Sequence, residues 1–131
     1  MIAKRIFAAL TALIALLGGG LTMAPTASAG SYGCGNTSNG QLCVRGGTLG
    51  KDGNYTFKVS YYRSPKAEIT VKLGTQRKNS KITALVLWFG SKKTKNGYVE
   101  LSKKHHLNAN ECIRGVMEYK GKTYVTKWRC P

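Results

Sequence analysis

Acidic residues are scarce in this sequence, which has five Asp and Glu against 21 Lys and Arg in 131 residues. Long apolar runs are also missing after residue 29. A membrane-spanning helix needs about 20 such residues, so we expect no membrane-spanning segment there. Catalysis by paired carboxylates would have to use the five acids, whose spacing shows no such pair: Asp52, Glu68, Glu100, Glu111 and Glu118.

Motifs of common enzymes are absent as well. No Gly-x-Ser-x-Gly sequence occurs, and the two histidines, His105 and His106, are adjacent. Serine-type catalysis needs a serine, a histidine and an acid that converge. Zinc sites favour Cys-x-x-Cys pairs and spaced histidines, and the chain has neither. We therefore predict a non-enzymatic protein without a metal or another cofactor.

One catalytic alternative is a small secreted ribonuclease. Such an enzyme can use a histidine, a glutamate and arginines as acid, base and phosphate clamp. The adjacent histidines lie in a polar stretch that is more typical of a solvated loop, and no ribonuclease motif is present. The candidate residues for this alternative are His105, His106, Glu111 and Arg114.

The first 29 residues are typical of a signal peptide. Lys4 and Arg5 precede an apolar run from Ile6 to Leu17, and Ala27-Ser28-Ala29 forms a small-residue cleavage site. Cleavage leaves residues 30–131, a length that fits one secreted domain. Two of the 21 basic residues and none of the five acids are removed, so 19 positive and five negative charges leave a net charge of +14.

Four cysteines lie after the cleavage site, and an even number in a small exported chain indicates two disulfides. Three pairings are possible from the sequence. We favour Cys34 with Cys43 and Cys112 with Cys130, because each pair closes a short local loop. In the chain-entropy model each bond stabilises the fold by roughly 3 kcal/mol.

The chain after residue 30 alternates between apolar and polar residues with period two, and glycine, asparagine, proline and serine punctuate the runs. Tyr55, Phe57, Val59 and Tyr61 are expected on the inner face of one strand. This pattern predicts an all-β domain, a small antiparallel β-sandwich of six or seven strands. The predicted strands cover residues 41–45, 54–62, 68–73, 82–89, 98–102, 112–119 and 123–128, with turns at 64–65, 95–97 and 120–122.

The stretch from Ile82 to Phe89 is apolar at nearly every position. We expect it to be a central strand that is covered on both faces, with Trp88 in the core. Basic residues concentrate in the predicted turns. Because loops cluster at the two ends of a sandwich, we expect several basic groups to lie together at one end and to attract anionic surfaces. The basic residues that we predict to make this contact are Arg77, Lys78, Lys81, Lys92, Lys93 and Lys95.

Aromatic residues are numerous for so small a domain. Tyr62, Tyr124 and Trp128 stand beside Arg, Thr or Lys near predicted strand ends. Aromatic and basic groups together suit a protein or glycan surface, so we predict that these three supply contact area. Packing in the core is the alternative for each of them.

Three segments resemble small secreted disulfide-bonded β proteins of streptomycetes and related actinobacteria. They are Asn39–Val44, the Tyr-x-Phe-x-Val-x-Tyr pattern at residues 55–61, and Val71–Gly74. The resemblance also includes the signal peptide and covers about half of the secreted chain. It implies a binding role, because some proteins of that kind are inhibitors and others are adaptor subunits of secreted toxin particles. It assigns no site residues.

These observations predict a secreted, extracellular basic protein that binds another protein or an anionic cell-envelope polymer, in microbial competition, as an adaptor or inhibitor. Nucleic acid could be bound without sequence specificity, because lysine outnumbers arginine and suits bidentate base recognition less well. A directly acting cationic antimicrobial protein is an alternative, although no basic amphipathic helix supports it. In a further alternative the charge only keeps the protein soluble or loosely held at the cell wall.

Overall fold

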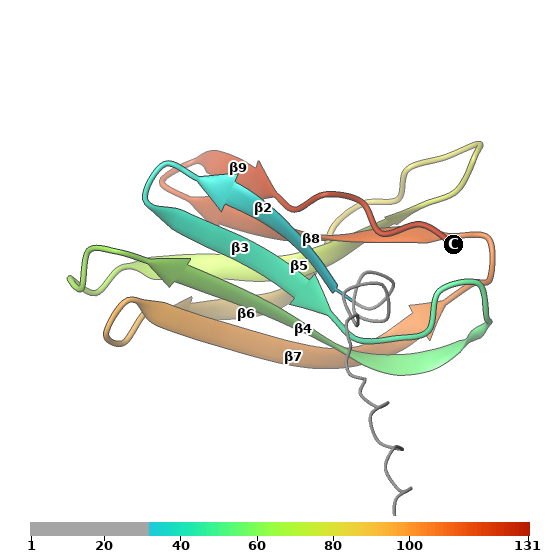
Figure 1. The fold of residues 1–131 in the computed structure, drawn as a ribbon, viewed down its shortest axis with the longest axis horizontal. Helices are drawn as coiled ribbons and strands as arrows, with labels where there is room; N and C mark the ends of the chain where they lie inside the picture. The colour runs from blue at the N-terminus through green and yellow to red at the C-terminus, as the bar shows by residue number, and fades with distance from the viewer. Residues whose placement is uncertain (1–31) are drawn as a thin grey trace, which may run out of the picture.

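The structure is a computed structural model that describes residues 32–131; the predicted signal peptide lies outside the described residues. The chain forms two antiparallel four-stranded sheets that face each other (Figure 1). This arrangement confirms the predicted β-sandwich, with eight strands where we expected six or seven. The additional strand comes from the glycine-rich segment around Cys34.

The first sheet has the order β2-β3-β4-β7, and the second has the order β6-β5-β8-β9. The strands of the first sheet are β2 (Tyr32–Thr37), β3 (Gly40–Arg45), β4 (Gly53–Arg63) and β7 (Tyr98–Leu107). Those of the second are β5 (Thr70–Lys78), β6 (Leu87–Lys93), β8 (Cys112–Tyr119) and β9 (Lys122–Val125).

The core lies between the two sheets and follows from the alternation of side chains along each strand. On β4, Phe57, Val59 and Tyr61 point inward as predicted and are at most 5% exposed. Residues from both sheets complete two neighbouring clusters. The first contains Leu42, Val44, Val59, Tyr61, Val71, Leu73, Val99 and Met117, and the second contains Phe57, Leu107 and Ile113.

Two predicted hairpin turns are confirmed. Asn96 and Gly97, between β6 and β7, have φ angles of 52° and 79°. Lys120 and Gly121, between β8 and β9, have φ angles of 49° and 76°. Positive φ at both central residues gives the turn a twist that matches that of the flanking strands.

Both predicted disulfides are also confirmed. Cys34 on β2 and Cys43 on β3 are direct cross-strand partners and are bonded to each other. Cys112 begins β8 and is bonded to Cys130 near the end of the chain. The second bond holds the segment after β9 against β8, where Ile113 and Arg129 exchange backbone hydrogen bonds.

The predicted central strand at residues 82–89 is wrong. The strand β6 begins only at Leu87 and lies at an edge of the second sheet. Between Leu73 and Gly74 its pairing with β5 shifts by one residue, so that Phe89 has no partner on β5 and packs against the core. Trp88, which we expected in the core, lies on the outer face beneath the Lys72 ammonium. Residues 79–86 form a loop between the two strands, named the β5–β6 loop below.

The two ends of the sandwich carry different loops. One end, named the β5–β6 end, carries the loops 46–52, 79–86 and 108–111 and the chain terminus at Pro131 (Figure 1). The opposite end, named the β6–β7 end, carries the connections 38–39, 64–69, 94–97 and 120–121. A basic segment in one of these connections therefore lies at the end of the sandwich where its neighbouring strands begin or finish.

Candidate functional site

Most basic side chains in the described part of the chain have no acidic partner. Within 4 Å, a Lys58–Glu100 pair and an Arg77–Glu111 pair join opposite charges, each at 3.5 Å. The five acids are too few to neutralise 19 basic residues, so the positive charge remains available to an external anion.

The predicted basic residues fall into two groups at opposite ends of the sandwich, not together at one end. Thr70 of β5 pairs with Lys93 of β6, so the end of β6 lies beside the start of β5. The segment Arg77–Lys81 therefore lies at the β5–β6 end, while Lys92–Lys95 lies at the β6–β7 end. These two segments do not share an end, because a hairpin places the ends of its two strands at opposite ends of the sheet.

Trp128 is the centre of the first group. The Lys78 ammonium lies 4.5 Å from the centre of the Trp128 ring, and the Arg114 guanidinium lies 4.2 Å from it. Arg114 is held there by Gln76, whose Oε1 accepts hydrogen bonds from Nε at 3.0 Å and Nη2 at 2.8 Å. Two cations are thus fixed on one aromatic ring, a contact that contributes about 0.5–1 kcal/mol at exposed sites.

The arrangement follows from the register of β5 with its neighbours. Gln76 pairs with Arg114 of β8, and Gly74 pairs with Trp88 of β6, so their side chains share the outer face of the second sheet. The Lys72 ammonium lies 4.6 Å from the Trp88 ring centre on the same face. Partial burial lowers the pKa of Arg114, but a guanidinium remains charged at neutral pH. We name this surface the aromatic–basic face; it consists of Lys72, Gln76, Lys78, Trp88, Arg114 and Trp128.

Two other predicted residues lie near this face. Lys81 is exposed in the β5–β6 loop and is available to a partner. Arg77 is less available, because Nη1 lies 3.5 Å from a Glu111 carboxylate oxygen and donates to the His106 carbonyl at 3.4 Å. We therefore assign Arg77 a role in joining β5 to β7 and the 108–111 loop.

The second group surrounds a cavity of about 300 Å³ between β6 and β7. Its lining includes the predicted lysines, and the Lys92 ammonium donates to the Glu100 carbonyl at 3.4 Å. The apolar floor and cationic edge suit an anionic group that carries an apolar portion. The cavity is lined by Lys92, Lys93, Lys95, Tyr98, Val99 and Glu100.

Tyr62 joins the second group through Tyr98, its cross-strand partner on the outer face of the first sheet. Both rings are exposed, and the Lys66 ammonium lies 5.5 Å from the Tyr62 ring centre. The Tyr98 hydroxyl donates to Glu100 at 2.7 Å, and this bond lowers the pKa of the Glu100 carboxyl. Burial, followed by the same carboxylate, raises the pKa of Tyr98.

Tyr124 belongs to neither group. It lies on β9 opposite Met117 and is partly buried against the core, which favours the packing alternative. Three residues of these groups were not predicted, namely Lys72, Gln76 and Tyr98, and Arg114 was predicted only as a catalytic candidate. Each of these residues belongs to its group because of contacts between strands, such as Gln76 with Arg114 and Tyr98 with Tyr62, which no local sequence pattern shows.

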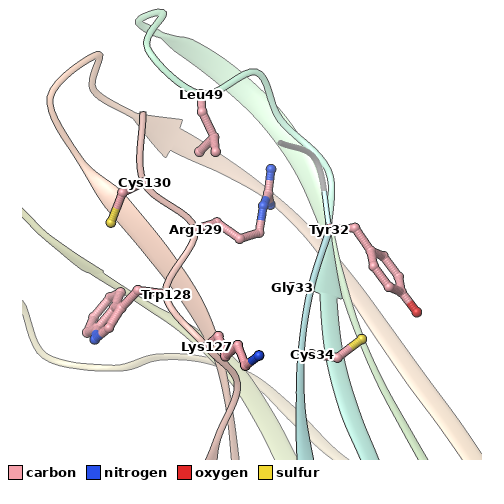
Figure 2. A pocket seen from close by; sticks show the side chains of 8 residues that line it. All are labelled: Tyr32, Gly33, Cys34, Leu49, Lys127, Trp128, Arg129 and Cys130. Carbon is pink, nitrogen blue, oxygen red and sulfur yellow. The ribbon is translucent and has the colours of Figure 1, made fainter. Parts of the chain in front are cut away.

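A second cavity, of about 460 Å³, lies between β2 and the C-terminal segment (Figure 2). Arg129 points into this space, is only 4% exposed, and donates from Nη1 to the Gly46 carbonyl at 2.9 Å. Gly33 permits this approach, because a Cβ there would lie 2.8 Å from the Arg129 Cγ. Trp128 also lines the cavity, which therefore adjoins the aromatic–basic face.

The ribonuclease candidates lie on different surfaces. His105 faces the interior, where its ring stacks on Phe57 with centroids 4.4 Å apart. His106 faces outward and contacts Asn108 at 2.8 Å, while Arg114 lies on the aromatic–basic face. Glu111 is close to His105 but is 8% exposed and accepts a hydrogen bond from the Asn108 backbone. The four residues do not form one accessible site.

Neither the family models nor the curated proteins compared with the chain match it. Among residues 32–131, no three His, Cys, Asp or Glu lie where they could hold a metal ion. No helix in that range is long and apolar enough to cross a membrane. Two disulfides in a small protein are consistent with an extracellular location.

Proposed function

We propose that this protein is a secreted, non-enzymatic binding module that attaches to an anionic partner, which is an envelope polymer or the acidic surface of another protein. The aromatic–basic face and the lysines around the 300 Å³ cavity make the contact. On the resemblance described above, the setting is microbial competition, with the module acting as an adaptor or inhibitor.

The observation that supports the proposal most strongly is the fixed position of Arg114 between Gln76 and Trp128. A charge that only keeps a protein soluble needs no such support, because a freely moving lysine serves equally well. Fixing a guanidinium lowers the conformational entropy that is lost when an anion binds. The arrangement therefore favours a binding function over simple solubility.

The cavity at the β6–β7 end supports the same function in a different way. Lysines surround an apolar floor there, and Tyr62 and Tyr98 extend the surface across the first sheet. Because the two groups are at opposite ends, a long polymer or a large partner could contact both at once. Simultaneous contact raises the overall affinity through effective concentration.

The test compares three variants that each remove three positive charges. The first, K78Q/K81Q/R114Q, alters the β5–β6 end, and the second, K92Q/K93Q/K95Q, alters the β6–β7 end. The control, K51Q/K103Q/K104Q, removes exposed charges outside both groups. Binding of the exported protein to poly(glycerol phosphate), a model for teichoic acid, is measured across a range of salt concentrations.

Each of the two test variants is expected to bind about tenfold or more weakly at low salt and to depend less on salt concentration. The control should differ from the wild type by less than about threefold. Equal losses in all three variants would show that the charge acts diffusely and would overturn the proposal.

To distinguish a protein partner from an envelope polymer, the native mass of the protein is measured in its producer's culture medium at low and high salt. A companion of fixed stoichiometry, identified by mass spectrometry, would establish a protein partner. Recovery as a bare monomer together with tight polymer binding would establish the envelope polymer. A bare monomer that does not bind the polymer would overturn the proposed function.

A further inference from the structure

The β5–β6 loop exposes two large aliphatic side chains. Ile82 is 66% exposed and Leu85 is 94% exposed, the highest values among the large hydrophobic residues that the structure describes. Residues of this kind are usually buried, and neighbouring exposed ones mark interaction surfaces. Because they belong to one short loop, a single partner can cover both.

The exposure is maintained by hydrogen bonds within the loop. The Asn79 side-chain oxygen accepts from the backbone amides of Lys81 at 2.8 Å and Ile82 at 3.0 Å. Thr83 pairs with Lys78, and Gln76 donates from Nε2 to the Ala84 carbonyl at 2.9 Å. These bonds fix the backbone of the loop at its start and at its base.

Basic residues lie beside the two aliphatic residues, within the loop and at its base. Lys81 precedes Ile82 directly, Lys78 stands at the base of the loop, and Gln76 joins the loop to Arg114. The sequence has no acidic residue between Glu68 and Glu100. An anionic partner with an apolar layer beneath its charges would complement this arrangement.

The shape of the loop favours one kind of partner. It projects beyond the strands at the β5–β6 end (Figure 1). A protein would need an apolar pocket of matching shape with acids around it to receive such a projection. A lipid bilayer needs no matching pocket, because its anionic headgroups lie directly above a deformable apolar layer.

We propose that the β5–β6 loop is a membrane-docking element that inserts Ile82 and Leu85 into the surface of an anionic lipid bilayer. Lys78, Lys81 and Arg114 then contact lipid phosphates while the sandwich remains outside the membrane. This inference depends on the proposed function in one respect, which is that the partner is anionic. The insertion of two aliphatic side chains is a separate claim with its own test.

The test uses exported protein and large vesicles made of phosphatidylcholine alone or with about 30% phosphatidylglycerol, a fraction that gives a strongly negative surface. The variant I82S/L85S removes the aliphatic side chains and no charge. The control V125S alters an exposed aliphatic residue on β9, outside the loop. Cosedimentation measures binding, and the pressure rise of a lipid monolayer at constant area measures insertion.

The wild type and V125S are expected to bind the anionic vesicles and to raise the monolayer pressure. I82S/L85S should bind those vesicles at least tenfold more weakly, raise the pressure little, and still bind poly(glycerol phosphate) like the wild type. Its urea midpoint should equal that of the wild type, because both altered residues are exposed.

Two results would overturn the membrane inference and leave the proposed function intact. One is equal vesicle binding and equal pressure rise by wild type and I82S/L85S, which would show adsorption by charge alone. The other is binding to poly(glycerol phosphate) without binding to anionic vesicles, which would indicate that the loop serves a protein pocket. Failure to bind either anion would count against both proposals.

Discussion

His105 and Phe57 stack in the interior with their ring planes 23° apart and their centroids 4.4 Å apart. The His105 Nδ1 donates to the His106 carbonyl, and Nε2 lies 2.9 Å from the Thr75 hydroxyl of the opposite sheet. Burial lowers the pKa of His105, and the nearby Arg77 charge lowers it further. The neutral imidazole is therefore a structural link between the two sheets.

This link predicts that stability decreases in mildly acidic solution. In the unfolded chain His105 takes up a proton near pH 6.5, whereas in the folded protein it does so at a lower pH. Between these two values the unfolded state binds more protons, so the free energy of unfolding falls as the pH falls. At pH values below the pKa of His105 in the folded protein, both states are protonated. His105 then causes no further decrease in the free energy of unfolding.

Urea midpoints measured from about pH 7.5 to pH 4.5 should show this decline in the wild type and a smaller decline in His105→Gln, which cannot take up the proton. His106→Gln is the matched control, because His106 lies on the exposed face of the same strand. It should keep the wild-type slope. A wild-type slope in His105→Gln would show that other groups cause the acid sensitivity.

The histidines also show what the sequence could and could not predict. The polar residues around the pair predict a solvated loop, whereas both histidines lie in β7, with His105 inside and His106 outside. By contrast, the pattern from Tyr55 to Tyr61 predicted β4 correctly. The Asn96-Gly97 turn was also predictable, because its positive φ angles depend on the local residues alone.

The wrong prediction at residues 82–89 has a different cause. Ile82 and Leu85 have the character of core residues, and only the pairing of β5 with β6 shows that the chain has left the sheet there. The contact between Gln76 and Arg114 likewise joins residues 38 positions apart. Such contacts depend on strand register, which the sequence alone did not supply.

Gln76 is expected to position Arg114 and the β5–β6 loop. Gln76→Leu removes the acceptor for Arg114 and the donor to Ala84, and should lower the free energy of unfolding by about 2 kcal/mol. It should also weaken binding to poly(glycerol phosphate), although no charge is lost. Urea unfolding and a binding titration measure the two effects.

The matched control for this prediction is Gln41→Leu. Gln41 is exposed on β3, and its hydrogen bond to Asn36 is long, at 3.5 Å. This change should cost less than about 0.5 kcal/mol and leave binding unaltered. Wild-type affinity in Gln76→Leu would contradict the positioning role, even if its stability were reduced.

The two disulfides are expected to differ in their effect on binding. Replacing either pair with serine should lower the free energy of unfolding by about 3 kcal/mol. The sequence separations are 9 and 18 residues, and such a doubling changes the chain-entropy term by only about 0.6 kcal/mol. Loss of the Cys112–Cys130 bond also releases the segment that holds Trp128. Loss of the Cys34–Cys43 bond acts on the edge strand β2, which lies beside that segment but does not hold Trp128 covalently.

We therefore expect binding to poly(glycerol phosphate) to weaken in C112S/C130S and to persist in C34S/C43S, measured where both variants remain folded. Circular dichroism establishes that condition, and urea unfolding gives the stability. Equal binding losses in the two variants would mean that the position of Trp128 does not depend on the second bond.

Gly74 is expected to be required where β6 meets β5. A Cβ at this position would collide with the Leu87 carbonyl oxygen and lie 2.9 Å from the Trp88 Cα. Backbone atoms cannot rotate away as a side chain can, so Gly74→Ala should displace β6. We expect a loss of about 2 kcal/mol in the free energy of unfolding.

Gly115→Ala is the comparison that tests this reasoning. A Cβ there would meet side-chain atoms, the Thr126 Cγ2 at 3.1 Å and the Val44 Cβ at 3.2 Å, so its neighbours would have to move by only a few tenths of an ångström. Its cost should be smaller, about 1 kcal/mol. Gly74→Ala should also weaken anion binding, because β6 carries Trp88 and two lysines of the 300 Å³ cavity, Lys92 and Lys93. Urea unfolding could instead show that Gly115→Ala lowers the free energy of unfolding more than Gly74→Ala does. That result would contradict the explanation that Gly74 is required by the close approach of β6.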